Sequence, residues 1–184
     1  YRKLKKELSK GDYLIIGFGH NDEKTDNERY TSAVGSINDE GSFKNILNEK
    51  YIKLAKELKA TPILATPIVR RIPDESKKYE GSYVHVTKDV DNFKGGDYAQ
   101  AIRELGAETG VYVIDNTKMT KELYEKIGFE ASRKLHAWLN EKPTSVDNTH
   151  LNAYGAHMVS YMMAKDLQAS KCKLGKYVKK ELME

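Results

Sequence analysis

Short apolar segments alternate along the chain with longer amphipathic ones. Three continuous apolar runs have the length and composition of buried parallel strands: residues 13–18, 62–66 and 111–114. Segments with apolar positions at helical spacing separate and follow them: residues 43–59, 97–109, 116–127 with an extension to Leu139, and 151–167. This alternation predicts an α/β fold, in which a parallel sheet is covered by helices on both faces in three α/β/α layers.

Long polar segments follow the first two apolar runs. Residues 19–42 lack clear periodicity, and residues 67–96 are also irregular apart from a small hairpin expected over 79–86. In open parallel sheets ligands bind outside the carboxyl ends of the strands, where long loops often carry function. We therefore expect the functional residues at this edge of the sheet. The first strand, residues 13–18, is expected to lie in the interior of the sheet, between two neighbouring strands.

The size and charge of the chain narrow the function classes. With 184 residues, of which 39% are hydrophobic, it is long enough for one domain over residues 1–184. The net charge of +4 arises from lysines interspersed with glutamates, which is typical of a solvated surface and argues against a nucleic-acid partner. No apolar run approaches the roughly 20 residues of a membrane span, so no membrane partner is expected.

The compartment follows only weakly from the sequence. Cys172 is the single cysteine, which excludes a disulfide within the chain and slightly favours a cytoplasmic location over a secreted one. The chain opens at Tyr1 within a helical pattern that ends near residue 9, so we expect a segment in front of it. A secretion signal would lie in that segment, and the location stays undecided between the two.

An acidic residue stands three positions before a histidine where a loop is expected to lead into the last helix. Asp147 can accept a hydrogen bond from one nitrogen of His150, which fixes the tautomer and leaves the other nitrogen to act as a general base. The alternative is a plain helix start, in which Asp147 or Thr149 caps the helix and His150 is incidental.

A second polar cluster, Gly19-His20-Asn21-Asp22, follows the first apolar run. An amide such as that of Asn21 can donate to the oxyanion that develops when an ester carbonyl is attacked. The alternative is that Asn21 and Asp22 only turn the chain after the strand. The histidines show no spacing typical of zinc ligands, so neither a metal nor another cofactor is expected.

Arg70 and Arg71 follow the second apolar run. A guanidinium group can bind a carboxylate through two parallel hydrogen bonds, so either arginine is a candidate for binding an acidic sugar. An equally good alternative is a surface pair that bridges to Asp74 or Glu75. We expect one of the two arginines to face the site.

These residues together resemble the SGNH (GDSL-like) hydrolase superfamily, and within it the rhamnogalacturonan acetylesterase group. The resemblance covers nearly the whole chain; Gly19-His20-Asn21-Asp22 matches the third of the four family blocks and Asp147-Asn148-Thr149-His150 the last. It implies a flavodoxin-like sheet, His150 as general base, Asp147 as its partner and Asn21 as oxyanion donor. It also implies that Gly19, His20 and Asp22 line a substrate site for an acetylated carbohydrate.

The chain departs from the family pattern at its beginning. The Gly-Asp-Ser block with the nucleophilic serine is absent, as is the glycine block that follows it, so the first strand of the fold is expected to be missing here. Its loss would expose apolar surface along residues 13–18. An upstream segment, a second copy of the chain or another partner would have to cover that surface.

The function expected from this resemblance is that of a serine carboxylester hydrolase. It would deacetylate a plant cell-wall polysaccharide of the rhamnogalacturonan or pectin type, or its oligosaccharides, through an acyl-enzyme, with the serine supplied from upstream. One alternative is an SGNH esterase or lipase that acts on a non-carbohydrate ester. The other is a carbohydrate-binding remnant that no longer catalyses.

Overall fold

The structure, a computed structural model, describes residues 1–24, 26–72, 95–138 and 145–179. The chain divides into two units. Unit 1 contains residues 1–67 and 88–115, and unit 2 contains residues 68–87 and 116–184. The α/β class predicted from the sequence is confirmed, whereas a single domain over residues 1–184 stays a prediction.

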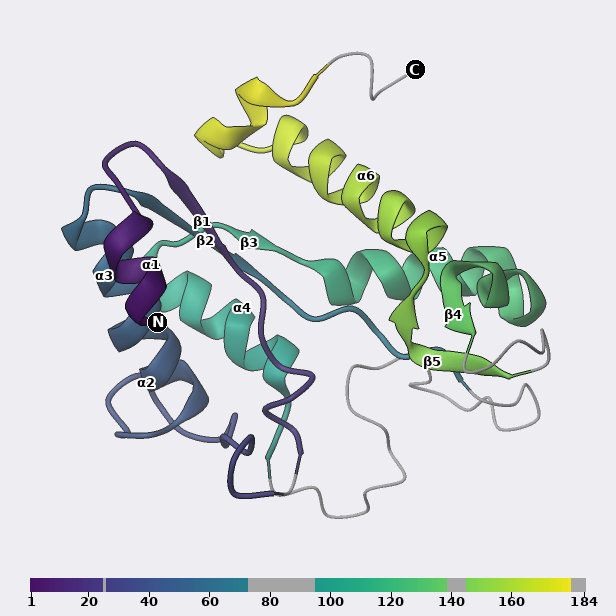
Figure 1. The fold of residues 1–184 in the computed structure, drawn as a ribbon, viewed down its shortest axis with the longest axis horizontal. Helices are drawn as coiled ribbons and strands as arrows, with labels where there is room; N and C mark the ends of the chain where they lie inside the picture. Colours follow the sequence, from purple (N-terminus) through teal and green to yellow (C-terminus); the bar gives the residue numbers. More distant parts are fainter. Residues whose placement is uncertain (25, 73–94, 139–144, 180–184) are drawn as a thin grey trace. The chain divides into compact units, whose positions relative to one another are not determined.

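A parallel three-stranded sheet forms the centre of unit 1 (Figure 1). Its strands lie in the order β1 (Tyr13–Ile16), β2 (Thr61–Ala65) and β3 (Val113–Ile114). Tyr13 pairs with Thr61, and Leu64 pairs with Val113. Leu64 is fully buried, as a central strand between two parallel neighbours requires. The three apolar runs of the sequence thus form the sheet, with ends shifted by one or two residues.

Helices connect these strands as the sequence predicts. Helix α1 (Arg2–Glu7) precedes β1, and the segment between β1 and β2 contains α2 (Phe43–Leu47), the π-helical turn η1 (Asn48–Ile52) and α3 (Lys53–Glu57). Helix α4 (Tyr98–Thr109) connects β2 to β3. Asp97, at the start of the predicted helix, caps α4 by accepting a hydrogen bond of 2.9 Å from the Gln100 amide. Gly110 ends the helix in the left-handed conformation, at φ 66°.

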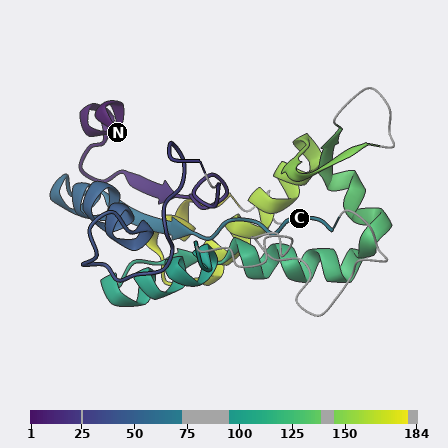
Figure 2. The same cartoon turned by 90° about the horizontal axis from the view of Figure 1, so that it is seen from below.

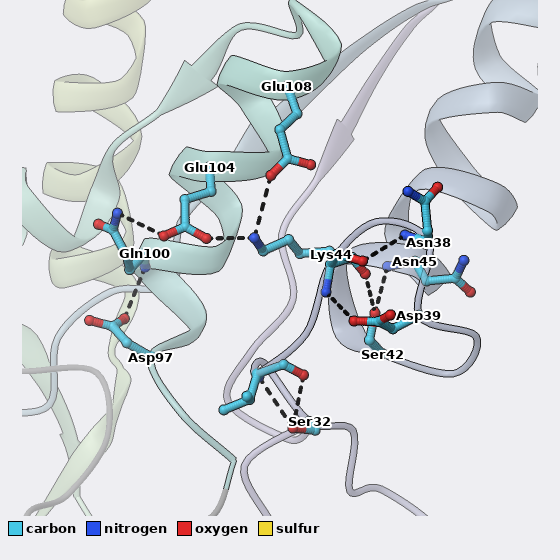
Figure 3. Close-up of polar contacts among 12 residues, drawn as sticks. Ser32, Asn38, Asp39, Ser42, Lys44, Asn45, Asp97, Gln100, Glu104 and Glu108 are labelled. Atoms are coloured by element: carbon cyan, nitrogen blue, oxygen red, sulfur yellow. Dashed lines mark hydrogen bonds and ion pairs between the residues drawn. The ribbon is translucent and has the colours of Figure 1, made fainter.

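Lys44 ties α2 to α4 within unit 1 (Figure 3). Its ammonium nitrogen lies 2.5 Å from Glu104 and 3.5 Å from Glu108, although its side chain is only 9% exposed. The hydrogen bond that Lys44 donates to Glu104 outweighs burial and raises the pKa of Lys44. Beside this ion pair the rings of Phe43 and Tyr98 meet edge to face, with centroids 5.1 Å apart. Polar and aromatic contacts therefore hold the two connecting helices together.

Strand β1 lies at an edge of the sheet. Among the described residues it pairs with β2 alone. Ile15, within the strand, is 44% exposed, and Phe18, two residues after its end, is 41% exposed. The expected interior position of this strand is therefore wrong for the part of the chain that the structure describes. The apolar surface expected along it is present. An edge strand with exposed large apolar side chains is a surface that folded proteins usually cover.

Unit 2 contains two long helices and a two-stranded antiparallel sheet. Helix α5 (Asn116–Ser132) changes direction at Gly128, whose φ is 82° (Figure 2). A 3₁₀ turn, η3 (Arg133–Leu135), leads into β4 (His136–Trp138), which pairs with β5 (Val146–Leu151). Helix α6 (Ala153–Ala169) and the 3₁₀ turn η4 (Lys173–Tyr177) complete the unit.

Two sequence predictions about unit 2 are wrong. The helix expected to extend to Leu139 ends at Ser132, because the chain pairs as β4 and buries His136 completely, a tertiary contact that overrides helical pattern. The stretch from Asp147 to His150 does not join a loop to a helix but lies within β5. The last helix begins two residues later than expected, and its cap is Asn152. The hairpin predicted over residues 79–86 lies outside the described residues.

Packing in unit 2 brings α6 against the turn that precedes β4. The buried core residues belong to the segment after β2, to α5 and to η3, and partly buried side chains of α5, β5 and α6 pack on them: Val69, Ile72, Tyr124 and Leu135, with Leu123, Ile127, Phe129, Leu151 and Met158. Gly155 in the first turn of α6 meets the backbone of Leu135 so closely that a Cβ atom would overlap the carbonyl group. This contact fixes α6 directly after the strand that carries Asp147 and His150.

Candidate active site

Strand β5 carries the predicted acid and base on an irregular stretch. His136 pairs with Leu151 and Trp138 with Val146, so one residue of β4 lies opposite the four residues 147–150 of β5. Such bulges leave residues out of the ladder and change the direction of their side chains, and they are common beside active sites. The irregularity therefore places the whole Asp147-Asn148-Thr149-His150 motif outside regular pairing.

Asp147 and His150 form the predicted pair. The Nδ1 atom of His150 lies 2.6 Å from Oδ2 of Asp147, which confirms that the two are within hydrogen-bonding reach. The other carboxylate oxygen accepts the amides of Thr149, at 2.7 Å, and of His150, at 2.9 Å. With Nδ1–H donated to the carboxylate, Nε2 is the nitrogen left to accept a proton. The His150 side chain is 77% exposed, so this nitrogen is open to a reactant.

The hydrogen bonds to Asp147 keep its carboxylate ionised. Burial raises the pKa of Asp147. The hydrogen bonds from the amide and the ring of His150 and from the Thr149 amide lower it by more, so the pKa lies below its usual value. An ionised carboxylate beside Nδ1 orients the imidazole and stabilises the imidazolium that forms when Nε2 takes a proton. The pair thus has the geometry and the charge of a general base with its orienting acid.

The two predicted arginines lie beside this pair. Arg71 is only 4% exposed, and its guanidinium donates to Ser132, to Asn148 and to the carbonyl of Phe129, whose ring lies 4.0 Å from the guanidinium carbon. Arg70 is 8% exposed and donates to the hydroxyl of Thr149 at 3.3 Å. Both arginines therefore contact the motif itself. Their expected role in binding an acidic sugar stays a prediction.

A buried histidine lies on the strand opposite the motif. His136 is fully buried, and its Nε2 atom lies 2.6 Å from the hydroxyl of Tyr124. Burial lowers the pKa of His136; the nearby charge of Arg71 acts in the same direction, whereas the backbone of Asp147 and the backbone of His150 act against it. The ring is therefore neutral in the folded protein at neutral pH. The sequence predicts a helix here, through the extension to Leu139, and no local pattern indicates the strand β4.

Because His136 is buried, we expect the folded protein to lose stability in mild acid. Because the pKa of His136 is lowered by folding, the unfolded chain binds a proton below its own pKa of about 6.5 that the folded chain does not. The free energy of unfolding should fall as the pH drops through this range, by up to about 1.4 kcal/mol per pH unit. Urea unfolding at pH 7.5 and 5.5 measures this difference. His136→Gln should remove most of it and the exposed His157→Gln should not; equal pH dependence in all three proteins would contradict the prediction.

The other predicted residues belong to unit 1, where they form a tight turn after β1. The amide of Gly19, whose φ is 135°, donates to the carboxylate of Asp22 at 3.0 Å, and burial raises the pKa of that carboxyl. The hydroxyl of Tyr98 lies 2.8 Å from the Asp22 carbonyl. Asn21 is exposed and His20 is half-buried. A turn is thus present, as expected if Asn21 and Asp22 turn the chain after the strand. The oxyanion role of Asn21 stays a prediction.

The structure brings together the predicted residues of unit 2. Asp147, His150, Arg70 and Arg71 are connected directly or through Asn148 and Thr149. Within the described ranges, no group of three or more histidine, cysteine, aspartate or glutamate residues could hold a metal ion. The described helices are all too short or too polar to span a membrane.

Comparison with known proteins places this geometry in a family context. No family model matches the chain. The rhamnogalacturonan acetylesterase RhgT of Bacillus subtilis is 32% identical over 171 residues, which are 90% of this chain and 64% of RhgT. The chain is thus similar in sequence to a rhamnogalacturonan acetylesterase. The resemblance predicted from the sequence is confirmed. The chain spans a little under two thirds of the length of the curated relatives it matches.

Two further comparisons give weaker matches. The probable rhamnogalacturonan acetylesterase YesY of the same bacterium is 28% identical over 158 residues, which are 85% of this chain and 62% of YesY. The crystal structure of the Bacillus subtilis protein YxiM matches with a TM-score of 0.65 at 23% identity, over 91% of this chain and 39% of YxiM. At that identity the match to YxiM supports the fold alone.

Sequence reasoning missed how the residues inside the motif are held. Asn148 and Thr149 were matched only as members of the motif, yet they receive the contacts from the two arginines. No role was predicted for Ser132, and it accepts the Nε–H of Arg71 at 2.9 Å. The signal available was the pair Arg70-Arg71 directly after a buried strand, which was interpreted either as a substrate-binding pair or as a surface pair that bridges to Asp74 or Glu75.

Proposed function

We propose that the chain is the part of a carbohydrate acetylesterase that carries its general base. The observation on which this proposal depends is the 2.6 Å contact between Nδ1 of His150 and the carboxylate of Asp147, in a chain that is 32% identical to the acetylesterase RhgT. Its substrate is an acetylated polysaccharide or oligosaccharide of the rhamnogalacturonan or pectin type. The names of RhgT and YesY support this substrate class.

The chemistry follows from the free nitrogen of His150. A serine hydroxyl attacks the acetyl carbonyl and gives its proton to Nε2, while the carbonyl oxygen becomes an oxyanion. When the tetrahedral intermediate collapses, the bond to the sugar oxygen breaks and the imidazolium returns the proton to that oxygen. Water then gives a proton to the same nitrogen and attacks the acyl carbonyl; the bond to the serine oxygen breaks, the imidazolium returns the proton to that oxygen, and acetate leaves. Asn21 donates its amide to the oxyanion in both stages.

The nucleophile comes from a segment upstream of Tyr1. The serines of the chain lack the Gly-Asp-Ser context of the family, and strand β1 leaves an unpaired edge within the described residues. A preceding strand that pairs with β1 would cover Ile15 and bring its serine to the carboxyl edge of the sheet. Both the missing block and the open edge support one and the same missing strand.

Release of acetate from acetylated rhamnogalacturonan tests this proposal. The 184-residue chain alone should release none, and the chain extended at its amino end by a family-type segment with the Gly-Asp-Ser block should release acetate continuously. Replacing the serine of that block by alanine provides the matched control, because it leaves the added strand in place. Acetate measured by enzyme-coupled assay distinguishes the three proteins.

Each alternative predicts a different outcome of this assay. Turnover by the chain alone would overturn the upstream nucleophile and would indicate a serine within the chain, of which Ser145 is nearest in sequence to the motif. An extended protein that hydrolyses only small or lipid-like esters would indicate a non-carbohydrate esterase. Binding of the polysaccharide without hydrolysis by the extended protein would indicate a carbohydrate-binding remnant.

A further inference from the structure

The two arginines and the two residues inside the motif form a set of contacts, here called the arginine clamp: Arg70, Arg71, Asn148 and Thr149. The backbone amide of Arg71 donates to the carbonyl of Asn148 at 2.9 Å, and its Nη1 donates to the Asn148 side chain at 3.1 Å. The Nε–H of Arg70 donates to the hydroxyl of Thr149 at 3.3 Å. Consecutive residues on one segment thus hold consecutive residues on the other.

The arginine clamp is anchored away from the motif. Arg71 also donates to Ser132 at 2.9 Å, to the carbonyl of Phe129 at 3.0 Å and to the carbonyl of Ile72 at 3.1 Å, and its guanidinium lies over the Phe129 ring. These partners belong to the end of α5 and to the segment after β2. A planar guanidinium with donors on several edges suits such a multiple anchor better than a lysine would.

The held residues determine whether Asp147 and His150 meet. The carboxylate of Asp147 accepts the amides of Thr149 and His150 in addition to the imidazole, so the peptide groups between the two residues must turn back toward it. Regular strand geometry would point alternate residues to opposite faces, and the bulged stretch 147–150 has only one residue of β4 opposite it. Contacts from outside the ladder are needed to keep this turn in one conformation.

We propose that Arg70 and Arg71 are positioning residues of the acid and base pair, which act through Asn148 and Thr149 rather than on the substrate. This inference rests on the proposed role of His150 as general base. The burial of both arginines, at 8% and 4% exposed, supports it, because a sugar carboxylate needs a guanidinium that it can reach. The arginine clamp fixes the turn in which one carboxylate receives all three hydrogen bonds.

The test uses the accepting side of the arginine clamp, since replacing the buried Arg71 can unfold unit 2. Asn148→Ala and Thr149→Val each remove one acceptor from a half-buried position, and Thr149→Ser keeps its hydroxyl as the matched control. The carboxyl titration of Asp147 in the 184-residue chain is followed by ¹³C NMR, with circular dichroism as a check on folding. In the first two variants the pKa of Asp147 should rise toward its ordinary value, and in Thr149→Ser it should stay low.

Kinetics of the extended protein separate positioning from substrate binding. On a small neutral acetyl ester, Thr149→Val should lower kcat by up to about 10²-fold with little change in KM, because a misplaced base slows the chemistry. A substrate-binding role would instead leave the neutral ester unaffected in Arg70→Met and raise KM only for a substrate with a uronate group.

The two readouts also separate this inference from the proposed function. An unchanged Asp147 titration in folded Asn148→Ala and Thr149→Val would overturn the arginine clamp, whatever the activity. An equal rise in Thr149→Ser would overturn it as well, because the accepting hydroxyl is still present. Raised pKa values in an extended protein without acetyl-ester turnover would support the arginine clamp and contradict the esterase proposal.

Discussion

Replacing His150 by alanine is expected to lower kcat of the extended protein for acetyl-ester hydrolysis by on the order of 10⁶-fold. His150 supplies the only nitrogen of the Asp147 pair that can take the nucleophile's proton, and members of such a catalytic unit lose nearly all activity together. Acetate release under saturating substrate measures kcat. The residual rate should not change when Asp147→Asn is added, since the pair acts as one unit.

His157 provides the matched control for this experiment. It is an exposed histidine in α6, seven residues after His150, and His157→Ala removes the same side chain from the same unit. Its kcat should equal that of the parent protein. A His150→Ala protein that retains more than about a tenth of the activity would show that another group accepts the proton.

Replacing Gly155 by alanine is expected to cost about 3 kcal/mol or more of the free energy of unfolding. The added Cβ would overlap the carbonyl of Leu135 and lie 3.0 Å from its Cα, and a backbone neighbour cannot move aside as a side-chain tip can. The melting temperature should fall by roughly 6–12 °C on the usual scale for a chain of this length. Thermal denaturation followed by circular dichroism measures it.

The sign of this effect separates packing from helix propensity. Alanine is favoured over glycine within a helix by about 1 kcal/mol, so without the contact Gly155→Ala would stabilise α6. The exposed neighbour Ala156→Gly reports that propensity directly and should destabilise by about 1 kcal/mol. A Gly155→Ala protein as stable as the parent would show that α6 does not pack on Leu135 this closely.

The parts of unit 1 that follow local rules could be predicted from the sequence. Continuous apolar runs predicted the three strands, and apolar positions at helical spacing predicted α4 over residues 97–109, close to its observed bounds. The pair of Asp147 and His150 was also predicted, because its spacing and its place in the motif required no knowledge of the surrounding fold.

The surroundings of the pair could not be predicted, because non-local contacts determine them. β4 is only three residues long and exists through its pairing with β5, the next strand along the chain, so the residues of β4 alone do not indicate it. Arg71 has the composition of a surface or ligand-binding residue, since arginine is seldom buried unless its donors are satisfied. Carbonyls and side chains from three separate segments satisfy them here, and no local pattern announces such a meeting.

The open edge of β1 has a consequence for amide hydrogen exchange. Asp12 accepts the Thr61 amide at 2.8 Å, so by alternation the even-numbered residues of β1 face β2 and the amide of Ile15 faces outward. In the chain alone that amide should exchange with solvent deuterium far faster than its neighbours at Leu14 and Ile16. Its protection in any longer form of the protein would report, at a single residue, that another strand has paired with β1.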